Sequence, residues 1–133
     1  MLQAKEKEQL YAHAKKAACH SYSPYSNFPV GAAVLTTSDH TFTGTNVENA
    51  SFGLTICAEQ AAIVNAINEG HRDFTAIAIY SKCEDIMPCG SCRQFIVEFG
   101  SKIEIICCRG GKLTSYLISD LIPNAFTGKD IPK

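Results

Sequence analysis

The sequence lacks the features that would assign it to a membrane, to an export pathway or to nucleic acid. No apolar run reaches the length needed to span a bilayer, and the N-terminal segment M-L-Q-A-K-E-K-E-Q-L has no apolar core of the kind found in export signals. Lysine and arginine are scattered and the formal net charge is only −1, so no basic patch attracts nucleic acid. We therefore expect a cytoplasmic protein whose partner is a small molecule, with no nucleic-acid and no membrane partner.

Internal repeats, linkers and low-complexity tracts are also missing from the sequence. Its 133 residues, 46% of them apolar, suffice for one core, so residues 1–133 are predicted to form a single domain. Cysteine, in contrast, occurs seven times. An odd number of cysteines without an export signal is more typical of free thiols or metal ligands than of a disulfide framework.

The hydrophobic pattern predicts an α/β fold. We expect a helix over residues 2–18, a hairpin of strands 30–36 and 41–47, a helix over 57–69, a strand over 74–80, a helix over 89–98, strands over 103–108 and 113–117, and a short helix over 119–121. This order fits a five-stranded mixed sheet covered by helices on both faces, a three-layer αβα sandwich. The two cysteine-bearing helices would then begin beyond the same edge of the sheet.

Two short segments carry the chemistry of the chain. They are T-I-C-A-E-Q at Thr55–Gln60 and P-C-G-S-C-R-Q at Pro88–Gln94, and they place Cys57, Cys89 and Cys92 at two predicted helix starts, where free backbone N–H groups and the helix dipole favour thiolates. A C-x-x-C pair alone also suits redox chemistry. The third cysteine favours zinc, and three protein ligands leave the open fourth position that distinguishes a catalytic zinc site from a structural one.

Glu59 is the candidate for proton transfer. It follows Cys57 by two residues, so the two side chains do not share a helix face, and Glu59 is free to flank the pocket instead of binding the ion. A carboxylate beside an activated water acts first as general base and then as general acid. A surface glutamate in a first helical turn is the alternative. A glutamate after the first ligand, with P-C-x-x-C downstream, is the signature of zinc deaminases.

Two further groups of residues leave alternatives open. The loop S-Y-S-P-Y-S-N-F-P holds Tyr22, Tyr25 and Phe28, which either pin the loop to the core or form a stacking wall for a flat ligand. Asn46 and Glu48 alternate along a strand end, where they either grip a sugar hydroxyl or form a polar turn.

The remaining cysteines have no partner at metal-ligand spacing. We expect them to be small buried residues: Cys19, Cys83, Cys107 and Cys108.

The motifs, taken together, resemble those of a known enzyme family. The segments S-P-Y-S-N-F-P-V-G-A-A, N-V-E-N-A-S, T-I-C-A-E-Q, P-C-G-S-C-R-Q and L-I-P-N-A-F are similar to those of the small, homotetrameric cytidine deaminases, over about residues 23–126. The metal motifs alone indicate the wider superfamily, whereas N-V-E-N and F-P-V-G-A-A are specific to the enzymes of free nucleosides. Cysteine as first ligand separates the chain from relatives that carry H-A-E.

The resemblance implies a role for each matching residue. It implies one Zn²⁺ per subunit on the three cysteines, with Glu59 as proton shuttle. It also implies a substrate site formed by the side chains of Phe28, Asn46 and Glu48, by backbone groups of Ala58 and Pro88, and by Phe126 of a neighbouring subunit in a homotetramer.

Two positions depart from the family pattern. Gln60 stands where the family usually has arginine, so we expect the helix N-termini and Arg93 to share in balancing the charge of three thiolates. Phe52 stands where the family often has tyrosine near the sugar, so any contact of that hydroxyl is lost.

The sequence therefore predicts hydrolytic deamination of cytidine and deoxycytidine to uridine and deoxyuridine, with release of ammonia, as in pyrimidine salvage. Two alternatives remain: a deaminase of an aminopyrimidine nucleoside antibiotic, and a structural zinc module without catalysis.

Overall fold

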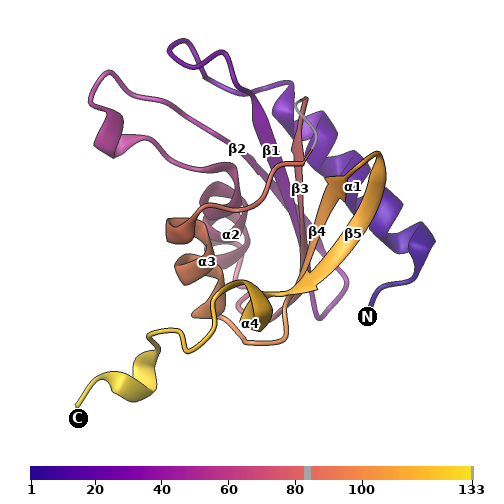
Figure 1. The fold of residues 1–133 in the computed structure, drawn as a ribbon, viewed down its shortest axis with the longest axis vertical. Helices are drawn as coiled ribbons and strands as arrows, with labels where there is room; N and C mark the ends of the chain where they lie inside the picture. Colours follow the sequence, from indigo (N-terminus) through magenta and orange to yellow (C-terminus); the bar gives the residue numbers. More distant parts are fainter. Residues whose placement is uncertain (83–84, 133) are drawn as a thin grey trace.

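A five-stranded mixed sheet forms the centre of the protein (Figure 1). The computed structural model describes residues 1–82 and 85–132. The strands are β1 (Val30–Thr36), β2 (Thr41–Thr45), β3 (Phe74–Ser81), β4 (Glu104–Arg109) and β5 (Lys112–Leu117), in the spatial order β2-β1-β3-β4-β5. β1 pairs antiparallel with β2 and β3, β3 pairs parallel with β4, and β4 pairs antiparallel with β5.

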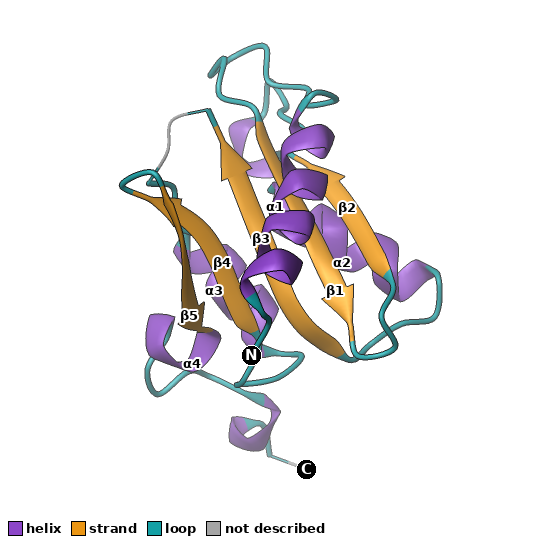
Figure 2. Cartoon of the chain, turned by 90° about the vertical axis from the view of Figure 1, so that its right-hand side faces the viewer, coloured by secondary structure: helices purple, strands orange, loops and turns teal. Residues whose placement is uncertain are grey.

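Helices cover both faces of this sheet (Figure 2). α1 (Ala4–Ala18) lies on one face, and α2 (Ala58–Asn68) and α3 (Gly90–Val97) lie on the other. The short α4 (Ile118–Leu121) follows β5. The predicted α/β fold with a five-stranded mixed sheet between helices is confirmed.

Alternation along the strands separates the two cores. In β3, Ile77 and Ile79 pack with the α2 and α3 side, whereas Ala76 and Ala78 pack with Leu10 and its neighbours on α1. Successive side chains of a strand point to opposite faces. The large residues therefore fill the space beside the cysteine-bearing helices, and the alanines let α1 lie close to the sheet.

Two glycines set how closely these helices approach. A Cβ on Gly31 would lie 1.9 Å from the carbonyl oxygen of Ala14 in α1, and a Cβ on Gly44 would lie 2.3 Å from the backbone nitrogen of Ala62 in α2. Any larger residue would displace a helix. Gly44 thus fixes the distance between β2 and the helix that begins after Cys57.

A buried carboxylate ties the N-terminal segment to the sheet. Glu104, 3% exposed in β4, accepts a hydrogen bond from the Leu2 N–H at 3.0 Å and pairs with Lys7 Nζ at 3.4 Å. Burial acts to raise the pKa of Glu104, but the hydrogen bonds from Leu2 and Lys7 and the charge of Lys7 outweigh it and lower the pKa. The ionised carboxylate therefore holds α1 in place near neutral pH.

Some local features differ from the prediction. β2 ends at Thr45 and not at residue 47, because the side-chain Oδ1 of Asn46 accepts the Val30 N–H at 3.0 Å in place of a strand partner. Two 3₁₀ turns, η1 (Phe52–Leu54) and η2 (Gly128–Asp130), were not predicted.

The cysteines outside the predicted metal site differ in burial. Cys107 and Cys108 are buried, as predicted, whereas the prediction for Cys19 is wrong: it is exposed because it lies just beyond the C-terminus of α1. Cys83 lies outside the described residues.

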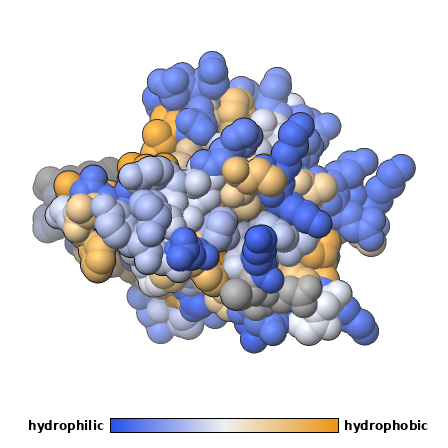
Figure 3. Space-filling view, turned by 90° about the horizontal axis from the view of Figure 1, so that it is seen from above, coloured by the Kyte–Doolittle hydropathy of each residue, from blue (hydrophilic) through white to orange (hydrophobic). Residues whose placement is uncertain are grey.

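The end of the molecule seen from above mixes hydrophilic and apolar groups (Figure 3). Within the described residues, no helix is both long enough and apolar enough to cross a membrane.

Candidate metal centre and its cavity

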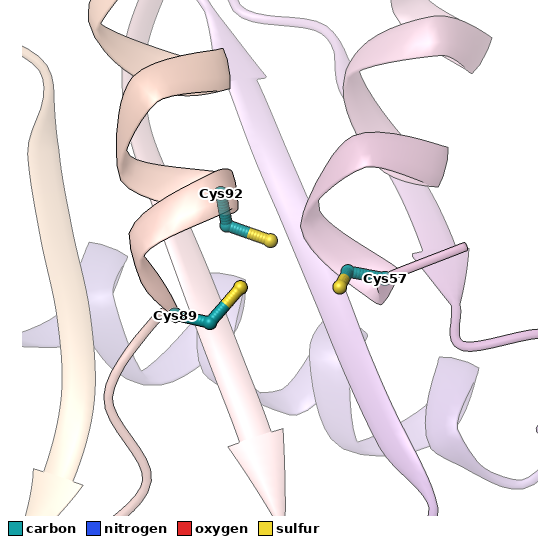
Figure 4. A group of neighbouring side chains, drawn as sticks. All are labelled: Cys57, Cys89 and Cys92. Carbon is teal, nitrogen blue, oxygen red and sulfur yellow. The ribbon is translucent and has the colours of Figure 1, made fainter. Parts of the chain in front are cut away.

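Three thiols meet between the first turns of α2 and α3. The ligand atoms of Cys57, Cys89 and Cys92 all lie within 4.8 Å of one another, and Figure 4 shows Cys89 and Cys92 pointing from α3 toward Cys57. They form the one such group of three or more His, Cys, Asp or Glu side chains among the described residues. The sequence prediction that these segments converge is confirmed.

The helix starts explain this convergence. Cys57 and Cys89 have extended backbone, with ψ of 152° and 169°, and are the N-cap residues of their helices. Cys92 lies one turn into α3, on the same side as Cys89, because residues three apart on a helix are neighbours. The free N–H groups of both first turns surround the sulfurs and favour negative charge there.

The donor set fits zinc. Thiolates bind Zn²⁺ at about 2.3 Å, so three of them in a tetrahedral arrangement lie about 3.8 Å apart, a small contraction from the observed cluster. Soft sulfur ligands select zinc over hard cations. Three ligands leave one of the four tetrahedral positions for water or substrate.

The thiols of Cys57 and Cys92 differ in pKa. A hydrogen bond with Cys92 lowers the pKa of Cys57 to about 7, against the opposing effects of burial and of the Glu59 charge. The same hydrogen bond, together with burial and the charge of Glu59, raises the pKa of Cys92. Cys57 therefore ionises before Cys92, and metal binding releases the protons that the cluster still holds.

Glu59 lies beside the cluster and is 5% exposed. It lines a cavity of about 170 Å³ together with Cys57, Cys89 and Asn46. Burial raises the pKa of Glu59, and hydrogen bonds from its own N–H and from Cys92 act against this rise. The alternative of an exposed glutamate in a first helical turn is wrong. A buried carboxylate with a raised pKa is suited to accept and return a proton near neutral pH.

Asn46 and Glu48 both hold the loop before β1. Asn46 accepts hydrogen bonds from Ser21 Oγ and the Val30 N–H, and donates to the Phe28 carbonyl at 2.9 Å. Glu48 accepts from the N–H groups of Tyr25 and Ser26 at 3.0 and 3.1 Å, and from Ser26 Oγ. The Ser26 hydroxyl is the main cause that lowers the pKa of Glu48. These hydrogen bonds hold both polar side chains in fixed positions, and Asn46 also lines the cavity at Glu59.

The loop aromatics are not buried. Tyr22, Tyr25 and Phe28 are 56%, 52% and 36% exposed, so the interpretation that they pin the loop to the core is wrong. Tyr25 contacts Phe52 of η1, with ring centroids 5.8 Å apart. Between these rings and Glu48 lies a second cavity of about 250 Å³, which shares Thr55 with the first.

The remaining predicted residues lie around these cavities or on the surface. Ala58 is fully buried, and it lines the first cavity. Pro88 is buried directly before Cys89. Phe126 is 60% exposed, and its carbonyl accepts a hydrogen bond from Gln94 Nε2 at 2.8 Å.

Known proteins share this sequence and this fold. A family model described as the cytidine and deoxycytidylate deaminase zinc-binding region matches residues 4–108. A probable cytidine deaminase of Dictyostelium discoideum is 42% identical over 95% of this chain and 87% of its own length. A cytidine deaminase of Sporosarcina psychrophila is 39% identical over 93% of each chain. The crystal structure of cytidine deaminase from Burkholderia pseudomallei has a TM-score of 0.85 at 42% identity, over 90% of this chain and 98% of that one.

The chain belongs to the cytidine and deoxycytidylate deaminase family.

In this deaminase family member, a neutral donor faces the three thiols at Gln60. The Gln60 amide Nε2 donates to Cys92 Sγ at 3.8 Å and to Ser91 Oγ at 3.2 Å, at the position where the resemblance implies arginine. Arg93 Nε donates to the Pro88 carbonyl at 2.8 Å, and its Nη1 donates to the Leu121 carbonyl at 2.9 Å. Arg93 thus braces the segment that leads into α3.

The deaminase site also contains residues that the sequence did not single out. Ile86 and Met87 line the cavity beside the thiols, and Ser21 and Ser26 hold Asn46 and Glu48. The apolar pair directly before Pro88 was a usable signal, because a strand-to-helix loop next to a ligand must line its cavity. Serines in a turn carry no such signal.

Proposed function

We propose that this protein catalyses the hydrolytic deamination of cytidine and deoxycytidine; its relatives are named cytidine deaminases. The observation that carries the proposal is the buried carboxylate of Glu59 in a cavity that also contains two of the three clustered thiols. This arrangement supports a role for Glu59 as the proton carrier beside a zinc ion that the thiols would hold.

Glu59 moves the protons of the reaction. When bound by Cys57, Cys89 and Cys92, zinc supplies a Lewis acid that makes water a nucleophile near neutral pH. Glu59 accepts a proton from the water and passes it to the ring nitrogen of the cytosine. It then takes a second proton, from the hydroxyl group that the water has added to the ring carbon, and gives it to the amine, which leaves as ammonia while that hydroxyl becomes the carbonyl of uridine. Its burial keeps bulk water from taking over this transfer.

The two cavities divide the substrate between them. The cavity of about 170 Å³ at Glu59, which Ala58 and Asn46 also line, receives the base. The resemblance to the family adds the Phe28 ring and the backbone of Pro88 to the base site. The cavity of about 250 Å³, which Glu48 lines, receives the sugar, and the remaining Nδ2–H of Asn46 is available to a sugar hydroxyl from the adjoining cavity.

The charges of the site favour a free nucleoside. Neither cavity has lysine or arginine among its described lining residues, and Glu48 brings a carboxylate to the sugar end. A phosphate on the substrate would meet this negative charge without a cation to pair with. Nucleotides and nucleic acids are therefore excluded as substrates, in line with the absence of a basic patch in the sequence.

The working unit is a homotetramer in the cytoplasm. Three large apolar side chains are exposed in the single chain: Phe52 (73%), Leu54 (65%) and Phe126 (60%). Exposure of such side chains to water is unfavourable and favours association with another subunit. We propose that Phe126 of one subunit completes the site of another. Three free thiolates also require a reducing compartment.

The test is the loss of cytidine absorbance on addition of the purified protein. We expect turnover by the zinc-loaded protein, less than about 1% of it after chelation, and recovery on adding zinc. Slow turnover of cytidine with fast turnover of an aminopyrimidine nucleoside antibiotic would favour that alternative substrate. No turnover of either would contradict the proposal.

A further inference from the structure

Phe28 is held by hydrogen bonds at both of its backbone polar groups. Its N–H donates to Ser26 Oγ at 3.0 Å, and its carbonyl accepts from Asn46 Nδ2 at 2.9 Å. The ring itself is 36% exposed, so core packing does not fix its direction. The position of this ring therefore depends on the two side chains that hold its backbone.

The hydroxyl of Ser26 connects this backbone to a carboxylate. An ionised carboxylate only accepts hydrogen bonds, so Ser26 Oγ must donate its single proton to Glu48 Oε2, and its lone pair is left to accept the Phe28 N–H. The direction of the chain Phe28 N–H, Ser26 O–H, Glu48 carboxylate is thereby fixed. Hydrogen bonds to a charged partner are stronger than neutral ones.

The loop has the backbone shape that this relay requires. Asn27, between Ser26 and Phe28, has a φ of 53°, in the left-handed region that asparagine tolerates, and its N–H donates to the Ser23 carbonyl at 3.0 Å. The reversal at Asn27 brings the Phe28 N–H back toward Ser26 Oγ.

We propose that Ser26 is a positioning residue that couples the base-stacking ring of Phe28 to the sugar-binding carboxylate of Glu48. This inference rests on the proposed function, which gives those two residues their roles. Ser26 lines the cavity proposed for the sugar and not the one beside the thiols, and its hydroxyl is occupied by Glu48 and the Phe28 N–H. Ser26 holds the loop in its binding conformation before substrate arrives, so that no conformational entropy of the loop is lost on binding.

Loss of the Ser26 hydroxyl should therefore weaken binding and spare the chemistry. For Ser26→Ala we expect KM for cytidine to rise about tenfold or more, with kcat within about twofold of wild type, as for an interaction made equally in ground and transition states. Ser26→Thr keeps the hydroxyl and should stay within about threefold of the wild-type KM. Ser23→Ala removes a hydroxyl of the same loop that contacts Ser21 and not Glu48, and should leave KM unchanged.

A double-mutant cycle tests whether Ser26 acts through Phe28. In a Phe28→Leu background, the aromatic ring that Ser26 positions is already absent. Adding Ser26→Ala to this background should therefore lower kcat/KM by less than about fourfold. If the fold-decreases in kcat/KM of the two single variants multiply in the double variant, Ser26 does not act through Phe28. A fall in kcat at unchanged KM, or failure of Ser26→Thr to restore KM, would also overturn the coupling. A Ser26→Ala protein that has lost its zinc or its circular dichroism spectrum would show a structural role instead.

A second readout keeps this inference separate from the proposed function. Hydrogen exchange at the Phe28 amide, measured without substrate, should be about tenfold faster in Ser26→Ala than in wild type or Ser23→Ala, because its acceptor is gone. If wild type does not turn over cytidine but this acceleration appears, the proposed function fails and the relay stands. Unchanged exchange at Phe28 overturns the relay whatever the enzyme's activity.

Discussion

We propose that Gln60 affects how the charge of the three thiolates is balanced. Its amide donates to Cys92 Sγ at 3.8 Å, which lowers the electron density of one thiolate without adding positive charge. We propose that the N-termini of α2 and α3 supply most of the remaining compensation, with Arg93 one residue after Cys92 as a further positive charge.

Gln60→Arg should therefore move the acidic limb of the pH–rate profile. An added positive charge favours the deprotonated state of the centre, so the pKa of that limb should fall, by about one unit. Gln60→Leu, which removes the donor, should move the limb the other way. The profile of kcat/KM for cytidine measures both, and an unchanged limb in Gln60→Arg would refute the role of this position.

The metal-free protein offers a test of the thiols themselves. Because the pKa of Cys57 is lowered to about 7 from an ordinary value of 9.0, Cys57 is largely thiolate above pH 7 and should be alkylated before Cys92, whose pKa is raised. Cys107, whose pKa burial raises to about 12, should not react in the folded protein. Peptide mapping after brief iodoacetamide treatment checks this order. Zinc should protect Cys57 and leave the exposed Cys19 reactive, and labelling of Cys57 that is unaffected by zinc would contradict the site.

The chemistry of individual side chains determined which site residues could be predicted from the sequence. Three soft ligands and one carboxylate are few enough in kind that Cys57, Cys89, Cys92 and Glu59 could be identified from spacing. Ser26 could not, because its partner Glu48 is 22 residues away and a serine in a turn has many possible partners.

Among the elements, α2 packs closely against β2, and Gly44 allows this approach. The Cβ of Gly44→Ala would lie 2.7 Å from the Ala58 carbonyl oxygen, so α2 must shift and carry Cys57 with it. Gly31→Ala has a matched clash with α1, on the opposite face from the thiols. Both variants should lose about 1–3 kcal/mol of unfolding free energy, but only Gly44→Ala should also bind zinc more weakly.

Denaturant unfolding and competition with a zinc chelator measure the two effects separately. Equal zinc affinities in the two variants would contradict the view that β2 positions the metal centre through α2.

Periodicity predicted the elements well, because buried strands and amphipathic helices have distinct repeats. It failed where a side chain replaces a backbone partner, as Asn46 does at the end of β2, and at η1 and η2, which are too short to show a period.

For the whole molecule, the question is whether one chain suffices for activity. Phe126 lies on the C-terminal segment after α4 and is largely exposed in the single chain. The order of the sheet followed from the predicted elements, but no pattern within one chain reveals which surface a second copy covers.

Mixed oligomers test the shared site. Phe126→Ala and Glu59→Gln subunits should each be nearly inactive alone. In tetramers assembled at random from equal amounts, about a quarter of the sites combine an intact Glu59 with a neighbour's intact Phe126, so about a quarter of wild-type activity should return. Absence of recovery in co-purified mixed tetramers would mean that each subunit completes its own site.

The central claim is that the thiols hold the ion and Glu59 moves the proton, and Glu59→Gln tests it most directly. The variant keeps the size and burial of the side chain and loses only its ability to carry a proton. We expect it to purify with as much zinc per chain as wild type, and to lose about a thousandfold or more in kcat for cytidine. Turnover near the wild-type rate in the zinc-loaded variant would contradict the account.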